Sequence, residues 1–152
     1  MVDMAKQGKK NRANGASFEL RTRKDLEVDG WIVDKWSNNL ELDLDFGGFK
    51  IHPAKRKWSG PGRPMAIGTG FPDFVAFRNI SYEDEEDAKS SLYEAIGVEC
   101  KCNGNLDKIE KEKCRWYLDS GTFGKILIAE KTKVKNKVVI VYHDFEEKYG
   151  KL

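Results

Sequence analysis

The chain has 152 residues, of which 39% are hydrophobic and 34% are charged, and its formal net charge is +2. This length suits one domain with a single core of two or three layers. No apolar run approaches the roughly 20 residues of a membrane span, and no signal-peptide core follows Met1, so a membrane protein is not expected and a cytoplasmic one is. We expect the three cysteines to be reduced. The cysteine and histidine side chains lack the paired spacing of a zinc site, so we expect none of them to bind zinc: Cys100, Cys102, Cys114, His52 and His143.

The first segment, residues 1–14, is polar and basic and shows no apolar periodicity. We expect it to form a flexible arm, followed by a single domain over residues 15–152. A solvated tail and an arm that contacts nucleic acid are both compatible with this composition. The cations of the arm are Lys6, Lys9, Lys10 and Arg12.

A helix is predicted from about Asn14 to Asp29, with Gly30 as its stop. Glu19 lies in its first turn and toward its packed side. There it could favour the start of the helix or reach a site beneath it. The packed side is an incomplete apolar stripe formed by Phe18, Thr22, Leu26 and Val28.

Two extended segments follow. Trp31–Trp36 is predicted to be a strand, and Leu40–Ile51 a half-exposed strand or hairpin that breaks at Gly47 and Gly48. Acidic residues alternate with apolar ones in the second segment. We interpret these acids as a solvent-exposed face, with a second metal site as the alternative: Glu41, Asp43 and Asp45.

The segment Pro53–Gly70 is predicted to be a long loop, because glycines and prolines recur through it. It carries clustered cations and an interleaved tryptophan, a combination that suits phosphate contact and base stacking. An ordinary solvated loop is the alternative. The candidate DNA-binding residues are Lys55, Arg56, Lys57, Trp58 and Arg63, together with Lys9, Lys10 and Arg12 of the arm.

Two apolar strands are predicted at Phe71–Arg78 and Leu92–Lys101, joined by an acidic surface connection at Ser81–Ser91. Successive side chains of a strand point to opposite faces, so Glu99 and Lys101 share one face. They converge near Asp73 if the two strands pair. Two carboxylates and a lysine in one small volume indicate a divalent-metal site with a cation beside it.

The remaining elements are a helix over about Leu106–Ser120 and two strands, Phe123–Glu130 and Lys137–His143. Gly121 supplies the stop of the helix, and a lysine-rich turn joins the strands. Glu146–Lys148 is interpreted as part of a charged tail. The predicted packed face of the helix consists of Leu106, Ile109, Lys113, Trp116 and Tyr117.

With this order of elements, the chain resembles the PD-(D/E)xK nuclease superfamily over roughly Gly15 to Glu130. The motif is present as Glu19, Pro72-Asp73 and Glu99-Cys100-Lys101. Gly15-Ala16-Ser17-Phe18-Glu19, followed by Leu26 and Gly30-Trp31, is similar to archaeal Holliday junction resolvases. Trp36-Ser37-Asn38-Asn39 and Gly70-Phe71-Pro72-Asp73 are similar to virus-type replication-repair nucleases.

The resemblance implies an α/β fold with a restriction-endonuclease-like αβββαβ core, in which helices flank a central mixed sheet. It implies that Asp73, Glu99 and the Cys100 carbonyl bind Mg²⁺ or Mn²⁺, with Glu19 completing the shell through water. Lys101 would then orient the attacking water or neutralise charge that develops on the phosphate. Glu19, Asp73, Glu99 and Lys101 are thus the expected catalytic residues.

We therefore expect a Mg²⁺-dependent DNA endonuclease of DNA recombination and repair that acts on four-way junctions as a homodimer. A replication-repair or restriction-like nuclease acting on flaps or duplex is the alternative within the same class. From another class come a non-catalytic DNA-binding module and a plain interaction protein.

Overall fold

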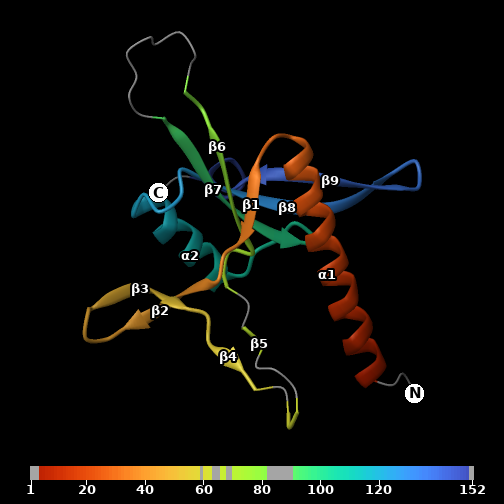
Figure 1. The fold of residues 1–152 in the computed structure, drawn as a ribbon, viewed down its shortest axis with the longest axis horizontal. Coiled ribbons are helices and arrows are strands. Elements are labelled where there is room, and N and C mark those ends of the chain that lie inside the picture. The colour runs from red at the N-terminus through yellow and green to blue at the C-terminus, as the bar shows by residue number, and fades with distance from the viewer. Residues whose placement is uncertain (1–3, 59, 63–65, 68–69, 82–90, 151–152) are drawn as a thin grey trace.

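The computed structural model describes residues 4–58, 60–62, 66–67, 70–81 and 91–150. These residues form an α/β fold with a mixed five-stranded sheet, a two-stranded hairpin and three helices, as predicted for the class (Figure 1). None of the helices in the described ranges is both long and apolar enough to cross a membrane.

The five-stranded sheet has the order β1-β6-β7-β8-β9. Its strands are β1 (Ile32–Lys35), β6 (Phe74–Asn79), β7 (Tyr93–Lys101), β8 (Lys125–Val134) and β9 (Lys137–Asp144). All neighbours are antiparallel except β7 and β8, which run parallel. Parallel strands require a crossover connection, and helix α2 (Lys108–Asp119) supplies it.

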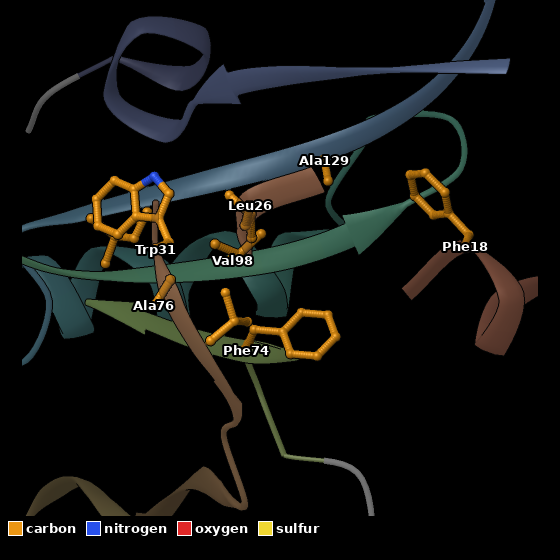
Figure 2. Close-up of a cluster of buried hydrophobic side chains, with 9 residues drawn as sticks. Phe18, Leu26, Trp31, Phe74, Ala76, Val98 and Ala129 are labelled. Carbon is orange, nitrogen blue, oxygen red and sulfur yellow. The ribbon is translucent and has the colours of Figure 1, made fainter. Parts of the chain in front are cut away.

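Helix α1 (Met4–Val28) covers one face of the sheet. Phe18 and Leu26 of α1 lie in a buried cluster with side chains from four strands (Figure 2). The members from β1, β6, β7, β8 and the turn before β1 are Trp31, Val33, Phe74, Ala76, Ile96, Val98 and Ala129. Val98 therefore lies in the core on the α1 side of the sheet, and the partly buried Cys100 packs against the same cluster.

The second helix and the short α3 (Phe145–Tyr149) pack against the opposite face. Cys114 and Tyr117 of α2 are buried there with Phe145 and with Ile126 and Ile128 of β8. Figure 1 shows α1 and α2 on opposite sides of the strands. Because Glu99 and Lys101 alternate with Val98 and Cys100, their side chains lie on the α2 side of the sheet.

The predicted start of the first helix near Asn14 is wrong, because α1 begins at Met4. Residues 4–14 are helical and do not form an irregular arm. Their side chains are exposed or half-buried, so no apolar stripe marked them as helix in the sequence. Val28, placed on the packed side by the pattern, is exposed, whereas Phe18, Thr22 and Leu26 are buried as predicted.

An insertion separates β1 from β6. The predicted hairpin is confirmed as β2 (Asn38–Asp43) paired with β3 (Gly48–Pro53). The segment predicted to be an irregular loop also contains β4 (Arg56–Lys57), which pairs with β5 (Ala66–Ile67). Most of the acidic connection, residues 82–90, lies outside the described residues.

The second half of the chain agrees with the prediction except in three places. Ile109, predicted on the packed face of α2, is 62% exposed, and Cys114 is buried instead. Strand β8 extends further along the chain than predicted, to Val134, so that only Lys135 and Asn136 form the turn to β9. The predicted charged tail contains α3, whose N-cap is Asp144.

Candidate metal and phosphodiester site

The predicted carboxylates meet where β6 begins and β7 ends. The backbone N–H of Asp73 donates a hydrogen bond to Glu99 Oε2 over 3.1 Å. The backbone N–H of Cys100 donates to Asp73 Oδ2 over 2.9 Å. These reciprocal bonds continue the β6–β7 ladder, whose first partners are Phe74 and Val98.

The approach to Asp73 is fixed by a close contact of backbone segments. A Cβ on Gly70 would lie 1.8 Å from the Trp36 carbonyl oxygen, so only glycine fits there. The N–H of Phe71 donates to the Asn38 carbonyl, and the N–H of Trp36 donates to the Asp73 carbonyl. The chain between Gly70 and Asp73 is thereby held against the end of β1.

Both carboxyl groups are poorly solvated. Glu99 is 6% exposed. Burial, followed by the neighbouring Asp73 carboxyl, raises the pKa of Glu99 from its ordinary 4.5 to about 8, although Lys101 opposes the shift. Burial also raises the pKa of Asp73, against the lowering effect of the Cys100 N–H. When both are ionised, the buried Glu99 carboxylate and the half-buried Asp73 carboxylate repel each other, and a bound cation would relieve that repulsion.

Lys101 lies between two acidic side chains. Its Nζ is 3.3 Å from Glu99 Oε1 and also donates to Glu110 Oε1, from the first turn of α2. Burial alone would lower the pKa of Lys101. The hydrogen bond to Glu110 and the charges of Glu99 and Glu110 outweigh burial, so its pKa lies above the ordinary value. Lys101 is thus held as an ammonium beside the carboxylate pair.

Glu19 reaches the same end of the sheet from α1. After burial, the charge of the Glu19 carboxylate also raises the pKa of Asp73. The Glu19 carboxylate itself is bound to Lys35 Nζ at the end of β1. The structure therefore brings Asp73, Glu99 and Lys101 into contact. Glu19 is instead paired with Lys35, a partner that the sequence did not reveal.

The donor set fits a hard divalent cation. Asp73 and Glu99 supply carboxylate oxygens and Cys100 a carbonyl oxygen, which are the ligands that Mg²⁺ and Mn²⁺ prefer. Among the described residues, no three His, Cys, Asp or Glu side chains gather into a metal site by themselves.

The candidate DNA-binding residues lie on two separate elements. Lys9, Lys10 and Arg12 are exposed on the N-terminal half of α1. Lys55 is paired with Glu41 of the hairpin at 3.2 Å, and Trp58 is 70% exposed. Arg56 is exposed as well. The side chain of Lys57 and all of Arg63 lie outside the described part of the chain.

Three residues near the site were missed by reasoning from the sequence. Lys113 of α2 donates to Asn39 Oδ1 over 2.7 Å, and its Nζ lies 5.6 Å from the centre of the Phe71 ring. The others are Lys35 and Glu110, described above. The pattern Asp107-x-x-Glu110 is a capping-box signature that could have placed Glu110 in the first turn of α2.

The carboxylate pair predicts how stability depends on pH. The folded-state pKa of Glu99 is about 8 and its ordinary value is 4.5. At a pH between these two values, Glu99 therefore releases its proton when the protein unfolds. In chelator, the melting temperature should therefore fall as the pH rises from about 4.5 to about 8, and Mg²⁺ should restore it. Thermal melts followed by circular dichroism across this range are the measurement.

Glu99→Gln removes the ionisation, so its melting temperature should depend less on pH than that of the wild type. Glu112→Gln, at an exposed position of α2, is the matched control and should behave as wild type. A Glu99→Gln variant with an unaltered pH dependence would show that the raised pKa lies elsewhere.

Comparisons of the chain with family models, with curated proteins and with solved structures found no match.

Proposed function

We propose that this protein is a metal-dependent endonuclease that hydrolyses phosphodiester bonds of DNA. The observation that carries the proposal is the convergence of Asp73, Glu99 and Lys101 at the junction of β6 and β7. The order of elements supports a restriction-endonuclease-like core. Along the chain, α1, β1, β6, β7, α2 and β8 follow the αβββαβ pattern, with β2 to β5 inserted after β1.

Each residue has a role that follows from its position. Asp73, Glu99 and the Cys100 carbonyl would hold Mg²⁺ or Mn²⁺, and Glu19 could add a contact through water. When bound, such a cation supplies Lewis-acid activation of water and charge stabilisation on the phosphate. The Lys101 ammonium lies beside the carboxylates, where it would neutralise charge that develops on the phosphate oxygens.

The substrate we propose is a four-way DNA junction cut by a homodimer, because two subunits would place two such sites on opposite strands. The resemblance to resolvases in the segment around Glu19 supports this choice. Flap or duplex cleavage is the alternative reaction of the same site.

The test is a substrate panel of four-way junction, flap and linear duplex, each incubated with Mg²⁺ and with chelator. We expect the four-way junction to be cleaved in preference to flap and duplex, and only when Mg²⁺ is present. Preferred cleavage of flap or duplex would move the assignment to the alternative. DNA binding without cleavage of any substrate would favour a non-catalytic module, and neither binding nor cleavage would leave only an interaction protein.

The basic half of α1 should contribute phosphate contacts. Replacing Lys9, Lys10 and Arg12 with glutamine keeps the helix and removes the charges. Affinity for DNA should fall, and the slope of log Kd against log salt should decrease by about 0.9 for each lost contact. Fluorescence anisotropy over a salt series measures both.

A matched variant neutralises Lys133, Lys135 and Lys137 at the exposed β8–β9 turn, where the change in charge is the same. The control should alter the slope less than the α1 variant. Equal slopes for the wild type and the α1 variant would place the DNA-binding surface elsewhere.

A further inference from the structure

Glu110 makes two different contacts with its two carboxylate oxygens. Oε2 accepts a hydrogen bond from the backbone N–H of Asp107 over 3.0 Å, and the Glu110 N–H donates to Asp107 Oδ1 over 2.8 Å. This reciprocal pair is a complete capping box at the start of α2. The other oxygen, Oε1, accepts from Lys101 Nζ. With both oxygens engaged, the side chain is held in one orientation.

The turn between β7 and α2 places this side chain over the end of β7. Gly104 has a positive φ of 67°, and its N–H donates to the Lys101 carbonyl over 2.9 Å. Its Cα also packs against Glu130 so closely that a Cβ would lie 2.6 Å from Glu130 Oε2. The tight turn brings the first turn of α2 back onto the face of the sheet that carries Glu99 and Lys101.

Lys101 is paired with two carboxylates, those of Glu99 and Glu110. With a divalent cation bound at the site, only one of them would remain fully available to Lys101. Glu99 would be shared with a divalent cation, and the cation would compete with Lys101 for its oxygens. Glu110 lies on the far side of Lys101 and belongs to no ligand set in the proposed function. Its contact with Lys101 can therefore persist when Glu99 turns to a cation.

We propose that Glu110 is a positioning residue that anchors the Lys101 ammonium beside the Asp73–Glu99 pair from helix α2. The inference rests on the proposed nuclease function and adds a residue that holds the Lys101 ammonium in place. Lys101 at the end of a strand has four rotatable side-chain bonds, and an anchored ammonium loses less freedom on reaching the phosphate.

A purely structural role would make Glu110 a capping residue with an incidental ion pair. The two roles separate by substitution. In Glu110→Gln, the side-chain carbonyl can still accept from the Asp107 N–H, so the cap survives and the charged contact with Lys101 is lost. In Asp107→Ala, the cap is weakened, but the contacts of Glu110 with the Asp107 backbone and with Lys101 remain.

For Glu110→Gln, the single-turnover rate in Mg²⁺ should fall between about tenfold and a hundredfold, with the Kd for DNA and the melting temperature unchanged. For Asp107→Ala, the melting temperature should fall by about 2 to 4 °C with little change in rate. Adding Glu110→Gln to Lys101→Met should change the rate by less than about twofold, because the two residues act as one unit.

A second readout needs neither metal nor activity. The ¹⁵Nζ–¹H signal of the Lys101 ammonium should be visible in chelator in the wild type and in Asp107→Ala, because a hydrogen-bonded, half-buried ammonium exchanges slowly. In Glu110→Gln it should broaden or disappear.

An unchanged Lys101 signal in Glu110→Gln, or a wild-type rate for that variant, would overturn the proposal while leaving the nuclease function intact. A wild-type protein that cleaves no DNA would instead count against the proposed function. The ammonium signal would then still decide whether Glu110 anchors Lys101.

Discussion

Replacing Asp73 with asparagine, or Glu99 with glutamine, is expected to lower the rate of DNA cleavage by about a thousandfold or more. Each substitution keeps the size of the side chain and removes one anionic oxygen donor from the pair. Affinity for DNA should stay close to that of the wild type, because neither carboxylate contacts phosphate directly in the proposed role. Single-turnover cleavage and anisotropy in the same buffer measure the two quantities.

Two further measurements make this result interpretable. Asp45→Asn, at an exposed position of the hairpin, controls for a change of one unit in net charge and should cleave as wild type. Isothermal titration with Mn²⁺ should show weaker cation binding for Asp73→Asn and Glu99→Gln. A loss of DNA binding in step with the loss of activity, at unaltered stability, would contradict the assignment of both residues as ligands.

Lys101→Met is expected to lower the single-turnover rate by roughly a hundredfold, with little change in the Kd for DNA. Methionine keeps most of the aliphatic stem and removes the charge, which acts on negative charge that develops only in the transition state. The Lys101 side chain is 27% exposed, so packing against β7 and α2 should survive. The rate is measured on a four-way junction at saturating Mg²⁺, beside the melting temperature.

The matched control is Lys125→Met, which removes a partly exposed ion pair with Asp144 at 3.5 Å, outside the site. Such a pair is worth at most about 1 kcal/mol of stability and nothing in rate. A Lys101→Met variant that behaves like Lys125→Met would remove Lys101 from the mechanism and would weaken the nuclease proposal as a whole.

The pairing of Asp73 with Glu99 could be predicted because it depends on strand alternation and on the antiparallel order of neighbouring strands. Both rules act over short stretches of sequence. Partners that come from other elements could not be found in this way. Lys35 meets Glu19 only because β1 crosses beneath α1, and Lys113 meets Asn39 only because the insertion lies against α2.

The errors in the secondary structure have a common physical origin. Residues 4–14 and Phe145–Tyr149 are helical without a broad apolar stripe, and the prediction relied on such stripes. In the second case, capping was the better signal. Asp144 accepts hydrogen bonds from the N–H groups of Glu146 and Glu147, as an N-cap residue does. The prediction interpreted this run of acidic residues as a charged tail instead of the start of a helix.

Because α1 is one continuous helix, it fixes the distance between Arg12 and Glu19. Arg12 and Glu19 are seven residues apart on one continuous helix. At 1.5 Å per residue, they lie about 10 Å apart along the axis and almost on the same side, since seven residues make close to two turns. A phosphate bound by Arg12 would then lie at a fixed distance and helical phase from the Glu19 carboxylate. A flexible linker between the two residues would allow that distance to vary. One inserted alanine between the two residues would turn Arg12 about 100° away and leave its charge unaltered.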